Sequence, residues 1–290
     1  MAPIEIWYKL LHILPFSWAQ YTFMHNALLA LLLVTPCFAL LGTMVVNNRM
    51  AFFTDVLGHS ALTGIAIGVL LGLHDPTPSM LVVAVVLAVA VNLLKNSTRA
   101  SADTVLGVFF AFIIALGIVI LSRQGGFAKY TSYLIGDILI VTPIQIAWFF
   151  LIGIIVLLYW HIAGNAMIVT SVNASLARSR KINTFLVETS FTILLALVVV
   201  VSIRLVGILI INSLLVLPAA ASRNFSRSIY SYTAWAVIIS IFSGITGLIA
   251  SYYWGTASGA TIVLFAAACY GLSVLLASVA SLLQKRKRFS

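Results

Sequence analysis

Asp55 and His59 have the residue types and the spacing to perform chemistry together. They are four residues apart, so on an α-helix both side chains lie on one face, one turn apart. A carboxylate oxygen and an imidazole nitrogen can together hold a divalent transition-metal ion, whereas neither is soft enough to select copper(I). One helix supplies only two such ligands. A two-fold dimer would bring two aspartates and two histidines together, close to a four-coordinate site.

The helix that must position this pair is apolar enough to cross a membrane. The stretch from Phe52 to Leu73 is long and apolar, and a membrane span needs about 20 such residues. A charged side chain inside a membrane costs at least about 2.5–3.5 kcal/mol, so it generally faces a partner or a water-filled path. Gly64, Gly68 and Gly72 follow on one stripe of the helix. Such a stripe predicts close contact with a neighbouring helix.

Asp55 and His59 also have a purely structural interpretation. Asp55 could cap the start of its helix or pair with Arg49, because acidic side chains are favoured at helix N-termini. His59 could be hydrogen-bonded in the protein core. The residues alone leave both interpretations open.

The overall composition excludes a soluble domain. The chain is 290 residues long, 62% hydrophobic and only 8% charged, with a mean hydropathy of +1.16. Too little polar surface would remain to face water. Lipid accepts only helices and closed barrels, and barrel strands alternate in polarity, whereas these apolar runs are continuous. We therefore predict an all-α, polytopic transmembrane protein.

The apolar runs predict nine membrane-spanning helices. Their expected positions are 25–46, 52–73, 78–95, 104–121, 142–161, 184–201, 205–221, 231–252 and 260–283. Only Ser202, Ile203 and Arg204 separate the sixth helix from the seventh, so the two could form one broken element and leave eight spans.

The distribution of basic residues favours the nine-span layout. That layout places twelve of the sixteen lysines and arginines on one side, which is then cytoplasmic. These twelve are Arg49, Lys95, Arg99, Arg178, Arg180, Lys181, Arg223, Arg227, Lys285, Arg286, Lys287 and Arg288. The N-terminus is therefore expected outside and the C-terminus inside. The net charge of +10 reflects membrane orientation rather than binding of nucleic acid.

The chain is expected to form one transmembrane domain with short terminal segments. We predict an interfacial segment at 1–24, the transmembrane domain at 25–283 and a basic cytoplasmic tail at 284–290. The longest cytoplasmic connection, 162–183, has three basic residues near its end. It either carries a function or acts only as an orientation signal. Cys37 and Cys269 lie inside apolar runs and are expected to be reduced packing residues.

The other polar residues near or within the spans have local explanations. Asp137 is expected to cap a helix start, and Glu188 to extend from its helix toward the cytoplasm. Asn212 and Ser213 are expected to form hydrogen bonds between helices. The remaining acidic residues fall in helix ends or loops, namely Glu5, Asp75 and Asp103.

Several catalytic patterns are missing from the sequence. It contains no GxxxxGK[ST] phosphate loop, so we expect ATP hydrolysis in a different subunit, if anywhere. It contains no HExxH motif of a zinc protease and no arginine-rich voltage sensor. The sequence therefore argues against a P-loop ATPase, a zinc protease of the HExxH type and a voltage sensor.

Four blocks of sequence resemble the membrane permease subunit of ABC importers for zinc and manganese, or for iron in some members. They occur in the order and spacing of that family, and the resemblance extends from about Pro15 to Leu283. The blocks are VVNNRMAFFTDVLGHSALTGIAIG (45–68), YLIGDILIVTP (133–143), VGILIINSLLVLPAAASRNFSRS (206–228) and SYYWGTASGATIVL (251–264).

The resemblance implies a pore made of two copies of this chain in a bacterial cytoplasmic membrane. An ATPase subunit that binds ATP would dock inside, and an extracytoplasmic metal-binding protein would deliver the ion outside. The family's aspartate and histidine fall on Asp55 and His59, which implies that both ligate the transported Zn²⁺ or Mn²⁺ (Fe²⁺ in some members), with no permanently bound cofactor. Within the 162–183 loop, residues 170–183 would be the coupling element for the ATPase.

The sequence departs from the family pattern at several positions. Thr54 stands where the family usually has glycine, Gly58 replaces serine or alanine, and Thr63 replaces a common proline. The coupling segment also lacks the acidic residues and the late glycine of many members.

Two other transport classes compete with this interpretation. An ion-coupled secondary metal transporter would also place aspartate and histidine at membrane depth. An ABC permease for a metal chelate would not need Asp55 and His59 as ligands.

Overall fold

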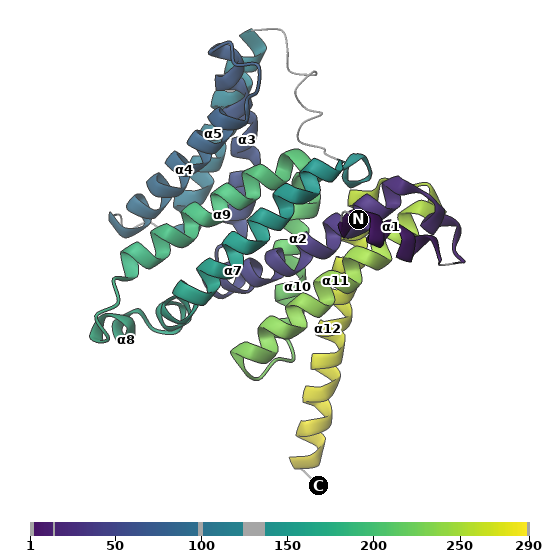
Figure 1. The fold of residues 1–290 in the computed structure, drawn as a ribbon. Coiled ribbons are helices and arrows are strands. Elements are labelled where there is room, and N and C mark those ends of the chain that lie inside the picture. The colour runs from purple at the N-terminus through teal and green to yellow at the C-terminus, as the bar shows by residue number, and fades with distance from the viewer. Residues whose placement is uncertain (1–2, 14, 98–100, 124–136, 289–290) are drawn as a thin grey trace. The chain divides into compact units, whose positions relative to one another are not determined.

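The computed structural model describes residues 3–13, 15–97, 101–123 and 137–288 (Figure 1). Throughout these residues the regular structure is helical, and none of them forms a strand. The all-α prediction is confirmed.

Most of the described chain lies in long helices. Eight of the described helices are long and apolar enough to cross a membrane. They are α2 (Thr22–Asn47), α3 (Ala51–Leu70), α4 (Thr77–Ser97), α5 (Ala102–Arg123), α7 (Pro143–Val172), α9 (Thr184–Val206), α11 (Ile229–Trp254) and α12 (Ser258–Arg288). One further apolar helix, α10 (Ile208–Arg223), is shorter. The polytopic helical architecture is therefore confirmed.

Short helices flank or connect these spans. They are α1 (Pro3–His12), η1 (Ser17–Gln20), η2 (Ile138–Ile140) and α8 (Ala174–Ser179). The segment predicted to be interfacial, 1–24, contains α1, η1 and the first residues of α2. Its placement at the membrane surface stays a prediction, as does the cytoplasmic location of the 284–290 tail.

The sixth and seventh predicted spans are two helices. Gly207 alone separates α9 from α10, and its φ of 88° lies in the left-handed region that favours glycine. α10 has 16 residues and is therefore about 24 Å long, which is less than the roughly 30 Å of a hydrocarbon core. The chain thus has a sharp break before a helix that is short for a full crossing.

The connection expected at 162–183 is mostly helical. α7 continues to Val172 instead of ending near residue 161, so that expected boundary was wrong. No proline interrupts this part of the chain, and the single Gly164 costs a helix only about 1 kcal/mol. The Asn173 side chain then accepts hydrogen bonds from the backbone N–H groups of Ser175 and Leu176, which starts α8.

The chain divides into two compact units, which are described separately. Unit 1 comprises residues 1–46, 137–153 and 213–290, and unit 2 comprises residues 47–136 and 154–212. In unit 1, α11 packs along α12. A Cβ atom added at Gly247 would lie 2.5 Å from the Cα atom of Ile262, so these two helices meet backbone to backbone.

Unit 2 is organised around α3. This helix packs against α4, α5 and α9 (Figure 1), and its membrane-spanning window is 72% buried, the highest share of the eight spans. A Cβ atom at Gly64 would lie 2.4 Å from the Cα atom of Met80, and one at Gly68 would lie 2.5 Å from Ser79 Oγ. The predicted close contact is confirmed for these two glycines. Gly72 instead lies beyond the end of α3 with φ of 70°.

Candidate metal-ion site

Asp55 and His59 lie on one face of α3, as their spacing predicted. His59 Nε2 is 3.8 Å from Asp55 Oδ1. The His59 side chain is 36% exposed and the Asp55 side chain 41% exposed, although most of their helical neighbours are buried. The pair is therefore partly open in the single chain and does not lie in a fully buried core.

Asp55 is not a helix cap. α3 begins at Ala51 with Met50 at the N-cap, so Asp55 lies beyond the first turn. Among the described residues its polar partners are His59 and Asn212 rather than Arg49. The capping interpretation of Asp55 therefore does not apply.

Asn212 of α10 provides the second polar contact of Asp55. Its amide Nδ2 donates a hydrogen bond of 2.8 Å to Asp55 Oδ1. The expectation that Asn212 bonds to another helix is confirmed, but the sequence did not identify Asp55 as its partner. The two residues are 157 positions apart, and the 3.6-residue helical period relates side chains only within one helix.

Phe110 of α5 positions the His59 ring. The two rings meet edge to face, with centroids 5.2 Å apart and planes at 89°. Phe110 also packs against Phe52, with ring centroids 5.3 Å apart. Aromatic contacts of this kind limit the rotation of the imidazole, so α3, α5 and α10 together fix the geometry around the pair.

Gly58 allows α10 to approach this face of α3. A Cβ atom at Gly58 would lie 2.4 Å from Ile208 Cδ1 and 3.7 Å from Asn212 Nδ2. Gly58 follows Asp55 by three residues, so it lies on the same side of α3 as Asp55. The departure from serine or alanine at this position therefore has a local reason in the contact with Ile208.

Asp55 and His59 would supply only part of the coordination shell of a metal ion. Within the described residues, no group of three or more histidine, cysteine, aspartate or glutamate side chains could hold a metal ion. Asp55 and His59 offer one carboxylate and one imidazole, a combination that suits divalent transition metals. Two such ligands from one chain would leave the coordination shell of a metal ion incomplete.

The other acidic candidates have structural partners. Asp137 accepts a hydrogen bond of 3.0 Å from the Leu139 backbone N–H, which confirms its capping role, and one of 3.1 Å from Ser258 Oγ. Glu188 of α9 forms an ion pair with Lys95 of α4, with 3.4 Å between Oε2 and Nζ.

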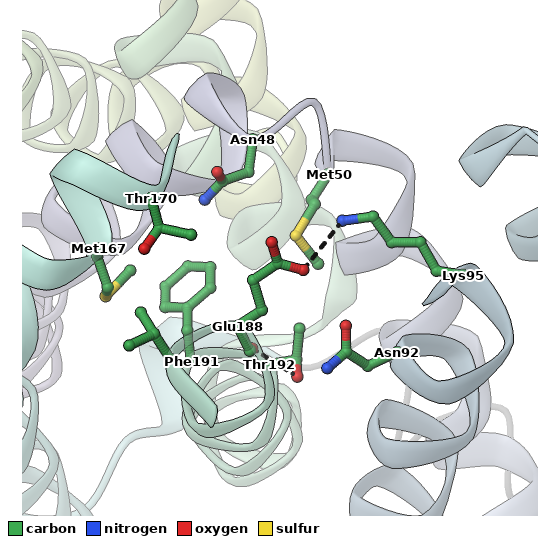
Figure 2. A pocket seen from close by; sticks show the side chains of 10 residues that line it. Asn48, Met50, Asn92, Lys95, Met167, Thr170, Glu188, Phe191 and Thr192 are labelled. Carbon is green, nitrogen blue, oxygen red and sulfur yellow. Dashed lines mark hydrogen bonds and ion pairs between the residues drawn. The ribbon is translucent and has the colours of Figure 1, made fainter. Parts of the chain in front are cut away.

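Figure 2 shows the Glu188 and Lys95 side chains turned toward each other beside Asn48 and Met50. The cavity that these residues line has a volume of about 20 Å³, room for about one water molecule. It is too small to hold a nucleotide or a metal chelate. The expectation that Glu188 extends toward the cytoplasm stays a prediction.

Residues 20–277 match the ABC 3 transport family. The chain belongs to this family. Among its relatives, the high-affinity zinc uptake system membrane protein ZnuB of Haemophilus influenzae is 35% identical over 254 residues, which are 86% of this chain and 95% of ZnuB. The manganese transport system membrane protein MntC of Listeria monocytogenes is 26% identical over 269 residues, which are 93% of this chain and 96% of MntC.

Solved structures share the fold of this ABC 3 family member. PsaBC from Streptococcus pneumoniae, solved in complex with Fab, aligns with a TM-score of 0.76 and 24% identity, covering 93% of this chain and 95% of the PsaBC chain. An inward-facing putative metal-chelate type ABC transporter aligns with a TM-score of 0.68 and 12% identity, covering 94% of this chain and 97% of the other. At these identities the two structures establish the fold and do not distinguish a metal ion from a chelate as cargo.

Proposed function

We propose that this chain is the membrane permease of an ATP-driven importer that carries a divalent transition-metal ion, zinc or manganese, past Asp55 and His59. The chain is a metal ABC importer permease of the bacterial cytoplasmic membrane and not itself an enzyme. The observation that carries the residue assignment is the Asp55–His59 pair, 3.8 Å apart and partly exposed on the most buried span.

The pair would act by replacing part of the ion's water shell. The Asp55 carboxylate supplies a charged oxygen and the His59 imidazole a nitrogen, which together offset the loss of water around a divalent cation. An aromatic contact with Phe110 limits the rotation of the His59 ring. The ion passes through without any covalent change to the chain.

The proposed partners follow from the same family assignment. A second copy of the chain would complete the coordination shell, and an extracytoplasmic metal-binding protein would deliver the ion. An ATPase subunit would dock on the 162–183 segment. Within this segment, α8 carries two exposed side chains, Leu176, which is 45% exposed, and Arg178. A short helix with an apolar and a basic side chain on its surface suits a protein partner.

Removing each proposed ligand tests the assignment. Asp55→Ala and His59→Ala are expected to reduce zinc and manganese uptake to background in proteoliposomes that contain the permease and its ATPase subunit, because each variant loses one ligand to the ion. Asp103→Ala and His74→Ala are matched controls, since both side chains lie on exposed helix ends or turns. Co-purification of the ATPase subunit shows that each variant assembles.

Three outcomes would contradict the proposal. Normal uptake by both Asp55→Ala and His59→Ala would exclude the pair as ligands. Uptake that follows an ion gradient without the ATPase subunit would identify a secondary transporter. Uptake of a chelate without competition from free zinc or manganese would identify a chelate permease.

A further inference from the structure

We infer that Asn212 is a positioning residue for the ion path, holding the Asp55 carboxylate in the orientation that receives the ion. This inference rests on the proposed function, because it assigns Asn212 a role through Asp55. It adds to the site a residue from α10, a helix that supplies neither proposed ligand.

The hydrogen bond between the two side chains joins an amide to a charged group. Asn212 Nδ2 lies 2.8 Å from Asp55 Oδ1, and the same oxygen is 3.8 Å from His59 Nε2. Hydrogen bonds to a carboxylate are about twice as strong as those between neutral groups. The Asn212 amide therefore holds one carboxylate oxygen from a second helix, while the His59 ring nitrogen lies near the same oxygen but beyond hydrogen-bond distance.

The other end of the Asn212 amide indicates that this contact sets its orientation. Among the described residues, the buried Oδ1 of Asn212 has no hydrogen-bond partner, although buried acceptors in proteins are nearly always paired. Rotating the amide by half a turn would place its oxygen against a carboxylate oxygen, and two acceptors repel each other. The hydrogen bond to the Asp55 carboxylate therefore sets the orientation of the Asn212 amide, although the amide oxygen has no partner among the described residues.

The packing around Gly58 supports the same conclusion. Gly58 has no Cβ atom, so no side chain separates this part of α3 from the start of α10. A Cβ atom at Gly58 would lie 2.4 Å from the Ile208 side chain. This close approach brings Asn212 within hydrogen-bond distance of Asp55. Residues that orient a metal ligand change metal affinity by about 10–100-fold when they are removed.

Direct binding of Mn²⁺ to the purified permease–ATPase complex tests the inference. Electron paramagnetic resonance reports the free ion, and omitting the extracytoplasmic binding protein confines the measurement to this chain. Asn212→Leu keeps the side-chain size but removes the donor, and is expected to raise the Kd for Mn²⁺ by about 10–100-fold. Asn212→Asp is expected to lower the Kd and to slow transport, because two adjacent carboxylates hold a divalent cation more tightly.

A matched control separates this role from general packing. Asn224 also donates an amide hydrogen bond of 2.8 Å, to Ser273 Oγ, remote in sequence from Asp55. Asn224→Leu is expected to leave the Kd for Mn²⁺ unchanged. Opposite shifts in Kd for the two Asn212 substitutions would not arise from a packing role, which both substitutions would disturb in the same direction.

The outcomes distinguish the inference from the proposed function. If Asp55→Ala abolishes Mn²⁺ binding while Asn212→Leu binds like the unaltered complex, only the inference is overturned. If the unaltered complex and Asp55→Ala bind Mn²⁺ equally, or neither binds it, the proposed function is overturned as well. Should Asn212→Leu fail to assemble, the exchange variant Asp55→Asn/Asn212→Asp decides. It must bind Mn²⁺ more tightly than Asp55→Asn alone, and equal binding overturns the inference.

Discussion

Asp55 is a carboxylate in an apolar span, and its surroundings explain how it is tolerated there. The side chain is 41% exposed in the single chain. Asn212 donates a hydrogen bond to it, and His59 lies 3.8 Å from the same oxygen. A charge in a membrane costs at least about 2.5–3.5 kcal/mol, and these polar contacts with the protein offset part of that cost.

Gly58→Ala tests whether the approach of α10 matters to the site. The new Cβ atom would meet the end of the Ile208 side chain at 2.4 Å and Asn212 Nδ2 at 3.7 Å. Because the end of Ile208 can rotate, we expect the variant to fold but to bind Mn²⁺ about tenfold more weakly, as Asn212 is displaced from Asp55. Adding Ile208→Ala should recover most of the affinity. Unchanged binding by Gly58→Ala would show that the site tolerates this displacement.

The sequence reveals the two proposed ligands but not their support. Asp55 and His59 share one helix, so their spacing alone places them on one face. Asn212 and Phe110 come from α10 and α5, and no local periodicity relates one helix to another. A polar residue in an apolar helix identifies Asn212 as a hydrogen bonder, whereas its partner emerges only from the packing of unit 2.

At the scale of the helices, α3 combines low hydropathy with high burial. The membrane-spanning part of α3 has a mean hydropathy of 1.4, the lowest of the eight spans, and is 72% buried. By contrast, α7 and α12 are each 17% buried, with a mean hydropathy of 2.3. Lipid disfavours polar surface. The less apolar helix, α3, accordingly packs against α4, α5 and α9, whereas the more apolar α7 and α12 leave most of their surface unburied.

Gly64→Ala is expected to destabilise unit 2. A Cβ atom at Gly64 would lie 2.4 Å from the backbone Cα of Met80, and a backbone atom cannot move aside as a side-chain end can. Overpacking of this kind costs about 1–3 kcal/mol, so thermal unfolding in detergent should occur at a lower temperature.

Gly107→Ala is the matched control for Gly64→Ala. A Cβ atom at Gly107 would have nothing within 4 Å, and replacing glycine by alanine inside a helix gains roughly 0.5–1 kcal/mol. This variant should therefore unfold at an equal or higher temperature. Equal unfolding temperatures for Gly64→Ala and Gly107→Ala would contradict the close contact between α3 and α4.

The ion pair between Lys95 and Glu188 is expected to link α4 to α9. Asn92 also donates a hydrogen bond to Thr189, close by on the same two helices. Removing Lys95 leaves a carboxylate without its cation, so Lys95→Ala should lower the unfolding temperature more than Lys95→Ala/Glu188→Ala does. A double-mutant cycle should give a coupling of about 0.5–1 kcal/mol. Additive effects of the two single variants would mean that the pair contributes nothing to stability.

The ends of the helices were harder to predict than their existence. Continuous apolar runs identify the spans because lipid demands them, whereas the end of α7 depends on where a helix stops in water. No proline marks that point, and the nearest signal is Asn173, which caps the start of α8. The break between the sixth and seventh spans was expected at residues 202–204, and this position was wrong, because α9 continues to Val206 and the break is at Gly207. One glycine in an apolar run can be either a turn or a helical residue.

For the whole molecule, orientation follows from charge rather than from packing. The nine-span layout collects twelve of the sixteen lysines and arginines on one side, and the positive-inside rule makes that side cytoplasmic. α10 is the element on which this layout depends, because its 16 residues are few for a crossing. If α9 and α10 together crossed only once, the turn after α10 would lie on the outer side.

Labelling of single cysteines with a membrane-impermeant maleimide decides between nine and eight crossings. In a background with Cys37→Ala and Cys269→Ala, Arg227→Cys places a thiol at an exposed position in the turn after α10. Nine crossings put that thiol in the cytoplasm, so labelling of intact cells should require permeabilisation. His74→Cys, at an exposed turn after α3, should react from outside, and Ser179→Cys, at the exposed end of α8, only after permeabilisation. If Arg227→Cys reacts in intact cells while both references behave as expected, α9 and α10 make a single crossing, and the positive-inside assignment of the C-terminal part is wrong.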